Sequence, residues 1–409
     1  MNIIRFISRI TIGVVFIYSG FVKGIDPLGS TYKFTDYFVA FGLDSLDIFA
    51  FPLAIVLSTL EFIIGINLLF GVRMILSSWA ALLFMALFTP LTFYLAIANP
   101  VHDCGCFGDA LILTNWQTFY KNLIIFIPTI ATFYLRKDYP VRYKMYAEWA
   151  IVGVFVALIA GTSFYSYNHL PVIDFRPYKL GTYIPDGMSI PDNAPQAEYK
   201  ITTYYEKDGV EKAFVFPDYP DSLWTWVRTD TELLKEGYEP PIHDFIIENF
   251  DGEDITDIIL YDDGYTFLLI SYDLKESNIN AQQKINELAT YCETNGHRFL
   301  CLTASTQEID QFIDNTEAPY EFCNVDEITL KTIIRSNPGL VLIKNGIVLG
   351  KLHYNDIPEI SEFNDNFLSY ILTKSREKIE NLLIASLVLS LLLVLSLFVL
   401  IHFMRRNRY

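Results

Sequence analysis

The feature that most constrains this chain is a series of long apolar segments. A helix that crosses the hydrocarbon core of a bilayer needs roughly 20 mostly apolar residues. Only 19% of the residues are charged, which is below the roughly 25% usual in soluble domains. We therefore predict a multi-pass membrane protein. The six predicted spans are residues 3–22, 48–70, 74–98, 116–135, 146–165 and 382–401.

Basic residues near these spans predict the orientation, because Lys and Arg favour the cytoplasmic side. Arg5 and Arg9 lie in the first span, and Arg73 lies in the loop before the third. Four basic residues occupy 136–144, whereas the loop at 99–115 has none. The pattern predicts an inner (plasma) membrane protein with both termini in the cytoplasm. The loop at 99–115 and the long segment from residue 169 then lie on the external, periplasmic side.

The long external segment is strongly acidic. Residues 169–372 carry 14 basic and 36 acidic side chains. Binding to nucleic acid depends on Lys and Arg contacts with phosphate, so this balance argues against a nucleic-acid partner. The predicted partners are the lipid bilayer and external client or partner proteins.

Changes in composition divide the chain into five predicted parts. They are a four-helix membrane domain (1–140), a fifth transmembrane helix (141–170), a β-rich connecting segment (171–240), an external α/β domain (241–372), and a last transmembrane helix with a basic tail (373–409). In the connecting segment, a D-G turn between residues 199–206 and 210–216 predicts a β-hairpin. The segment 231–241, which ends in two prolines, predicts a domain boundary.

The external domain shows alternating strand and helix patterns. We predict strands at 244–247, 267–272 and 298–303, helices at 279–294 and 327–335, and a final hairpin of 339–344 and 347–353. A buried strand is expected at 267–270 because these residues form a continuous apolar run. This order predicts an α/β sheet with one antiparallel edge.

That order, the opening I-H-D-F-I-I-E-N-F-D-G at 242–252 and the segment at 336–351 resemble the thioredoxin fold. The resemblance implies a cis peptide bond before Pro338, and an ordinary trans proline that ends a helix is the alternative. Thioredoxins carry a C-x-x-C motif after the first central strand, but residues 271–277 contain no cysteine. Buried structural roles are predicted for the three remaining cysteines of the domain, Cys292, Cys301 and Cys323.

The closely spaced cysteines of the chain lie in the external loop, in the sequence D-C-G-C-F-G from Asp103 to Gly108. A bridge between Cys104 and Cys106 would close a small ring, and Gly105 can adopt the positive φ that this bend requires. A strained disulfide is oxidising and easily attacked. The external side is also the oxidising compartment. A capping-box pattern at 114–117 predicts a helix directly after the loop.

Three interpretations of this loop remain open. Cys104 and Cys106 are a redox pair, or they bind a metal together with His102 and Asp103, or they are structural. Zinc sites usually space their thiols by two or more residues, so we predict no metal site here.

The membrane region resembles a known family. The pattern R-x-x-x-G-x-x-F-x-x-S-G-x-x-K at 9–23 and the run E-x-x-x-G-x-x-L-L-x-G at 61–71 resemble the DoxX family, and D-C-G-C-F-G resembles the loop of its MauE branch. The resemblance implies a role in disulfide formation in external proteins, together with a separate thioredoxin-like partner. DoxX relatives also include a subunit of a thiosulfate:quinone oxidoreductase, which makes a quinone a candidate cofactor. Here a thioredoxin-like domain without C-x-x-C is fused to the membrane region.

Glu61 is a carboxylate inside a predicted span, and such residues are candidates for function. The alternative is a carboxylate near a helix end that reaches water or pairs with Lys23. The sequence therefore predicts a membrane protein of thiol–disulfide chemistry, linked to a quinone, with Cys104 and Cys106 as the reacting pair. Asp103, Gly105, Glu61 and Lys23 are the expected supporting residues. A non-catalytic assembly factor that binds partners is the alternative function.

Overall fold

The computed structural model describes residues 2–101, 103–139, 144–207, 209–215, 220–221, 223–235, 237–359 and 367–374. The predicted last span at 382–401 and His102 of the cysteine loop lie outside the described residues.

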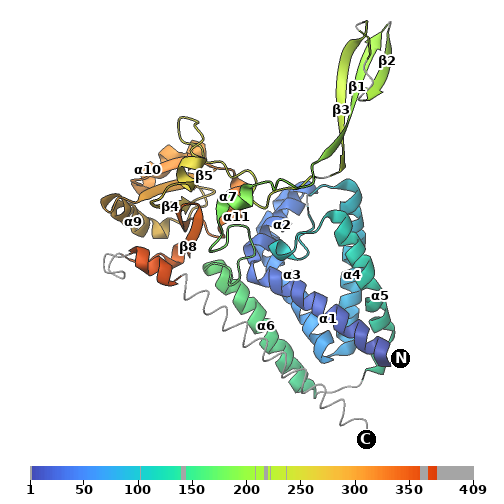
Figure 1. Ribbon diagram of the computed structural model, residues 1–409. Helices are drawn as coiled ribbons and strands as arrows, with labels where there is room; N and C mark the ends of the chain where they lie inside the picture. Colours follow the sequence, from blue (N-terminus) through green and yellow to red (C-terminus); the bar gives the residue numbers. More distant parts are fainter. Residues whose placement is uncertain are drawn as a thin grey trace.

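Helices make up the N-terminal region (Figure 1). Among the described residues, four helical segments are long and apolar enough to cross a membrane, and they are Ile3–Ile25, Asp44–Phe70, Met74–Ala98 and Met145–Asn168. The predicted span at 116–135 is helical but is not among these four, since its start carries Lys121 and Asn122. The helices are α1 (Asn2–Ile25), α2 (Pro27–Ala40), α3 (Ala50–Phe70), α4 (Met74–Ala98), α5 (Asn115–Tyr134) and α6 (Met145–Asn168).

Close packing of α1 against α3 organises the bundle. A Cβ atom on Gly20 would lie 2.4 Å from the backbone nitrogen of Phe62, so only glycine permits this approach. Helix α2 lies between α1 and α3 in the chain and was not anticipated from the sequence. Asp26 caps it by accepting a hydrogen bond from Gly29 N at 2.9 Å. The predicted capping box at Thr114–Gln117 is confirmed at the start of α5.

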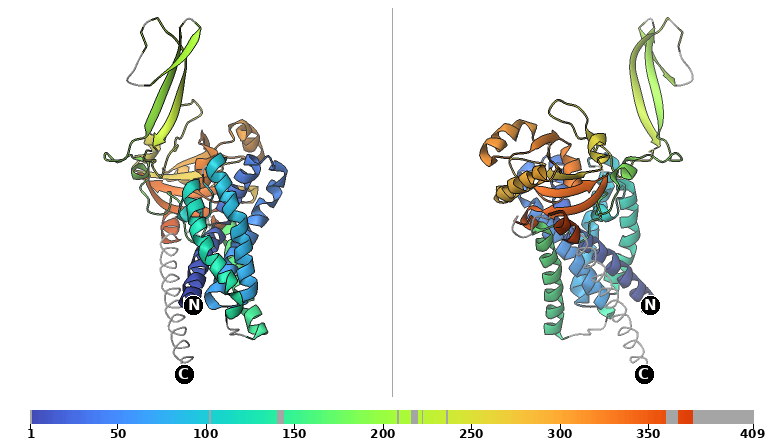
Figure 2. Two further views of the ribbon diagram at one scale, coloured as in Figure 1. Left: turned by 90° about the vertical axis from the view of Figure 1, so that its right-hand side faces the viewer. Right: turned by 60° about the vertical axis from the view of Figure 1, so that its left-hand side comes forward.

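The connecting segment forms a three-stranded antiparallel sheet in the order β2-β1-β3. This sheet projects away from the rest of the molecule (Figures 1 and 2). The predicted hairpin is confirmed as β1 and β2. The third strand was not predicted, and it extends into the expected boundary at 231–241. The strands are β1 (Glu198–Lys207), β2 (Val210–Val215) and β3 (Thr225–Lys235).

The α/β domain, residues 242–359 and 367–374, is built on a five-stranded sheet in the order β6-β5-β4-β7-β8. Strands β4, β5 and β6 are parallel, whereas β7 and β8 form the antiparallel edge. The strands are β4 (Tyr265–Ile270), β5 (Arg298–Thr303), β6 (Glu321–Asn324), β7 (Gly339–Lys344) and β8 (Ile347–His353). The associated helices are α7 (Ile184–Met188), α8 (Thr256–Leu260), α9 (Gln282–Thr294), α10 (Ile309–Thr316) and α11 (Glu327–Ile333).

Strand β4 is central because both of its faces are buried. Phe267 and Leu269 pack into one core, and Leu268 and Ile270 pack into the other. The predicted strand at 244–247 is wrong, since this segment is irregular and forms bridges only at Glu248. Strand β6 and helix α10 were missed, because four and eight residues are too short to show a clear period.

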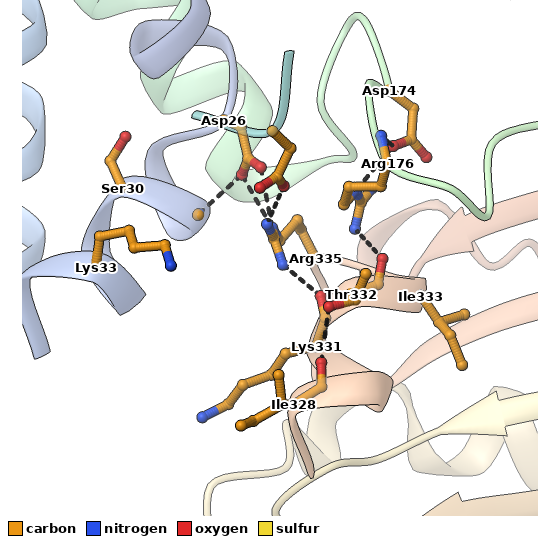
Figure 3. Close-up of polar contacts among 12 residues, drawn as sticks. Asp26, Ser30, Lys33, Asp174, Arg176, Ile328, Lys331, Thr332, Ile333 and Arg335 are labelled. Carbon is orange, nitrogen blue, oxygen red and sulfur yellow. Dashed lines mark hydrogen bonds and ion pairs between the residues drawn. The ribbon is translucent and has the colours of Figure 1, made fainter. Parts of the chain in front are cut away.

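The α/β domain contacts the membrane bundle through Arg335, which follows α11. Its Nε lies 3.1 and 3.0 Å from the carboxylate oxygens of Asp26, and its Nη2 lies 2.7 Å from Asp109 Oδ2 (Figure 3). The side chain of Arg335 is only 6% exposed. Nearby, the hydroxyls of Tyr32 and Tyr272 lie 3.1 Å apart. Because Asp109 belongs to the cysteine loop, this contact places the α/β domain beside the two loop cysteines.

Candidate functional site

The two cysteines of the loop are brought together by a tight bend. Cys104 Sγ lies 3.0 Å from Cys106 Sγ, and both thiols are free. Gly105 makes the bend with φ +65°. Its backbone N–H donates to Asp103 Oδ1 at 2.7 Å, while Lys33 Nζ donates to Asp103 Oδ2 at 2.8 Å. Asp103 therefore holds the loop in the conformation that makes the sulfur atoms neighbours.

The two thiols differ in acidity. The pKa of Cys106 is lowered to about 6, because the Cys104 thiol donates a hydrogen bond to its sulfur and because the charges of Lys121 and Lys23 favour the thiolate against the opposing effect of burial. The same hydrogen bond and burial raise the pKa of Cys104. Cys106 is therefore the thiolate of the pair and Cys104 is its proton-bearing partner.

A buried ion pair lies beside the cysteines. Lys23 Nζ lies 2.7 and 2.8 Å from the two carboxylate oxygens of Glu61, and it donates to Ser19 Oγ at 3.2 Å. Ser19 Oγ is 2.8 Å from both Glu61 Oε2 and the carbonyl oxygen of Cys106. Glu61 is 3% exposed and sits in the interior of α3, not near its end. The supporting residues Lys23 and Glu61 are thus linked to the cysteine loop through one hydroxyl.

These groups line a cavity of about 310 Å³ within the bundle. Cys104, Gly105, Cys106, Lys23 and Glu61 lie in its wall. The remaining wall is mostly apolar and comes from α1, α2, α3, α4 and α5. The apolar and aromatic lining residues are Val15, Phe16, Phe34, Tyr37, Phe38, Phe41, Leu43, Leu57, Phe84, Met85, Phe88, Leu91, Phe107 and Ile125.

Sequence reasoning missed several polar residues of this site, among them Tyr37, Lys33 and Lys121. Tyr37 OH donates to the carbonyl oxygen of Cys104 at 2.9 Å. Lys121 Nζ lies 4.2 Å from the centre of the Phe107 ring. A signal for Lys121 exists in the sequence, since a lysine seven residues into an apolar helix needs a partner. Tyr37 and Lys33 gave no such signal, because helix α2 was not expected.

The other expected residues lie elsewhere. Pro338 belongs to the α/β domain, where the Asn337–Pro338 peptide bond is cis, and it does not line the cavity. Cys292, Cys301 and Cys323 are buried in the same domain. Burial raises the pKa of Cys292 to about 12 and that of Cys323 to about 11. These thiols are therefore unreactive at neutral pH.

No group of three or more His, Cys, Asp and Glu side chains is arranged to hold a metal ion within the part of the chain that the structure describes. His102, which the metal interpretation requires, lies outside that part.

Comparison with known proteins supports the membrane assignment of the first region. Residues 1–135 match the family described as methylamine utilisation protein MauE. This region is therefore a MauE-like membrane region. Residues 199–236, which include most of the projecting sheet, match a domain of unknown function, DUF8463. No curated protein matches the chain.

Two solved structures resemble part of the chain. One is an uncharacterized conserved protein from Geobacillus kaustophilus, with 14% identity, a TM-score of 0.25, and coverage of 32% of this chain and 79% of that one. The other is a candidate protein disulfide isomerase from Bacteroides thetaiotaomicron, with 14% identity, a TM-score of 0.25, and coverage of 33% and 89%. TM-scores this low carry no argument about fold or activity.

Proposed function

We propose that this chain is a membrane thiol–disulfide oxidoreductase in which Cys104 and Cys106 form the redox pair and a quinone accepts the electrons. One observation carries the proposal: two neighbouring thiols, one of them with a lowered pKa, line a mostly apolar cavity inside a membrane bundle. The MauE-like character of residues 1–135 is compatible with a role in redox chemistry or maturation of external proteins.

The low pKa of Cys106 suggests the direction of exchange with a client protein. A client thiolate attacks Cys104 Sγ in the oxidised pair, the Cys104–Cys106 bond breaks, and Cys106 leaves as the more stable thiolate. A second client thiolate then attacks the mixed disulfide and releases Cys104. The client gains one disulfide bond, the loop pair gains two electrons, and Cys104 takes up a proton from water while Cys106 stays a thiolate.

The reduced pair must then pass on two electrons, and two protons accompany them, one from the Cys104 thiol and one from water. A quinone takes up both and becomes a quinol, while the sulfur–sulfur bond forms again. The cavity suits such an acceptor, because small-molecule sites are largely apolar and occupy about 300–1,000 Å³. Three of its polar lining residues, Ser19, Lys33 and Tyr37, hydrogen-bond to the cysteine loop. A quinone ring in this cavity therefore lies beside the two sulfur atoms.

We propose that the cysteine loop faces the periplasmic side of the inner membrane. Arg5 Nη1 donates to Asp138 O at 2.7 Å, and Tyr139 OH donates to Arg5 O at 3.1 Å. The start of α1 and the end of α5 are therefore neighbours, at the end of the bundle far from the α/β domain (Figure 1). Basic residues concentrate at that end, which favours a cytoplasmic location. Two further spans, α6 and the segment at 382–401, then place both termini in the cytoplasm.

In this proposal the α/β domain, with its thioredoxin-like order of strands and helices, presents clients to the loop. It performs no exchange of its own, since residues 271–277 contain no cysteine and its three cysteines are buried. The same observation favours the alternative function, a non-catalytic assembly factor that only binds partners.

A single-turnover experiment decides between these functions. Full-length reduced protein in lipid nanodiscs is mixed anaerobically with decylubiquinone, and disulfide formation is followed by maleimide labelling and mass spectrometry. We expect Cys104 and Cys106 to become protected together as quinol appears in equal amount. Cys104→Ser/Cys106→Ser is expected to be inactive, whereas the matched control Cys301→Ala is expected to retain full activity. If the wild type stays reduced while partner proteins still co-purify with the double variant, the assembly-factor function is correct.

A further inference from the structure

The cavity is lined by three ammonium groups, and two of them already have anionic partners. Lys23 directs its three donors at Glu61 Oε1, Glu61 Oε2 and Ser19 Oγ. Lys33 pairs with Asp103 at 2.8 Å and lies 3.8 Å from Asp36 Oδ2. Lys23 therefore has no donor left for a bound molecule, and the ion pair with Asp103 holds Lys33 at the cysteine loop.

Lys121 is different. Its ammonium group lies 4.2 Å from the centre of the Phe107 ring, and among the described residues it makes neither a hydrogen bond nor an ion pair. An ammonium group has three donors. The charge of Lys121 stabilises the Cys106 thiolate, but its donors have no acceptor at hydrogen-bond distance among the described residues. Lys121 lines the cavity together with Asn122 and Ile125 of the same helix. The amide nitrogen of Asn122 already has an acceptor, because its Nδ2 donates to Thr92 Oγ1 at 3.1 Å.

We propose that Lys121 holds the quinone in this cavity, because its ammonium group donates a hydrogen bond to a carbonyl oxygen of the quinone. This inference rests on the proposed function and adds the residue that would hold the acceptor. Phe107, with one face against Lys121, follows Cys106 directly in the chain. An oxygen bound to Lys121 therefore places the quinone ring next to the thiolate of the pair.

The charge of Lys121 also suits the reaction. Forming the disulfide breaks the S–H bond of Cys104, joins its sulfur to the Cys106 thiolate, and transfers two electrons to the quinone, which takes up one proton from Cys104 and one from water. Its carbonyl oxygens gain electron density before they are protonated, and an ammonium group at hydrogen-bond distance stabilises that density. Lys121 ends the reaction in its initial protonation state. One proton of the quinol derives from the Cys104 thiol and the other from water, since Cys106 is already a thiolate.

The test separates binding from redox turnover. Decylubiquinone binding is measured with full-length Cys104→Ser/Cys106→Ser protein in nanodiscs, alone and with Lys121→Met, Lys121→Arg or Lys144→Met. Lys144 is a matched control, since it also lies near an aromatic ring, 6.0 Å from the centre of Tyr146, but does not line the cavity. We expect Lys121→Met to weaken binding at least tenfold, a loss of about 1.4 kcal/mol. Lys121→Arg is expected to stay within about threefold of the parent, and Lys144→Met to have no effect.

Turnover is then measured with the cysteines restored. We expect Lys121→Met to raise the KM for decylubiquinone at least tenfold. Lys121→Arg is expected to keep the KM close to that of the wild type. Unfolding temperatures of both variants identify a variant that fails to fold, and Lys121→Gln is then used in its place. Unchanged quinone binding and KM in folded Lys121→Met would overturn the role of Lys121 while leaving the redox function intact. A wild type that binds decylubiquinone through Lys121 but never oxidises its cysteines would instead overturn the proposed function.

Discussion

The cysteine loop of the bundle and the core of the α/β domain place the same side chain in opposite environments. In the loop, Cys104 and Cys106 lie 3.0 Å apart beside lysine side chains and a cavity. In the α/β domain, Cys301 and Cys323 lie on adjacent strands but pack into the cores on opposite faces of the sheet. Burial alone raises a thiol pKa, whereas a hydrogen-bonding partner and nearby cations lower it. The comparison teaches that reactivity here depends on what surrounds each sulfur.

The most direct way to break this comparison is to measure thiol reactivity in the folded protein. With a pKa of about 6, Cys106 is mostly thiolate at pH 7, whereas Cys292, with a pKa of about 12, is almost wholly protonated. Since the thiolate is the nucleophile, we expect Cys106 to react with iodoacetamide about a thousandfold faster than Cys292. Peptide mass spectrometry after timed quenching measures both rates.

The pH dependence sharpens the same test. Thiolate forms as pH rises through the pKa, so alkylation of Cys106 should increase with a midpoint near pH 6 and level off above about pH 7. Alkylation of Cys292 and Cys323 should still be rising at pH 9. The contrast between the two regions fails if Cys106 shows a midpoint near 9, or if all five cysteines react alike in the folded protein.

A second, smaller effect is the loss of stability expected when the buried Lys23–Glu61 ion pair is broken. Glu61→Gln leaves the ammonium group of Lys23 without its carboxylate in a buried position, and we expect a loss of about 3 kcal/mol in unfolding free energy. Thermal and denaturant unfolding of the full chain in nanodiscs measures the loss. Glu232→Gln is the control, because its pair with Lys200 is exposed and 3.8 Å long, and it should change stability by less than about 0.5 kcal/mol. Equal effects of the two substitutions would contradict a structural role for the Lys23–Glu61 pair.

The smallest expected effect concerns the contact that joins the two regions. Arg335→Ala removes the guanidinium that pairs with Asp26 and Asp109, and we expect the docking of the α/β domain to weaken by about 2 kcal/mol. Hydrogen–deuterium exchange should increase in both contacting segments, residues 103–114 and 271–277, and alkylation of the loop pair should accelerate severalfold. Arg228→Ala is the control, since its pair with Glu211 lies at the surface of the projecting sheet. An exchange pattern like that of the control would show that Arg335 does not hold the domain in place.

Much of the secondary structure could be predicted because it depends on local patterns. Apolar runs identified the long helices of the bundle, and the apolar run at 267–270 identified the central strand β4. The capping box at Thr114 and the Asn345–Gly346 turn of the last hairpin were equally local. Helix α2 was missed because its apolar residues face a cavity wall that several helices build together, and β6 was missed because it is short.

The sequence by itself determined which segments are apolar enough for a membrane, where β4, β5 and the last hairpin of the α/β domain lie, and that two cysteines share one tight loop. These properties follow from short-range periodicity and from covalent spacing. Only the tertiary structure decided that Lys23 meets Glu61 and that Lys121 faces the cavity beside Phe107. It also decided that Arg335 reaches Asp26, 309 residues earlier in the chain. Such pairings depend on how helices pack against one another, and residues so far apart in sequence leave no periodic signal of their contact.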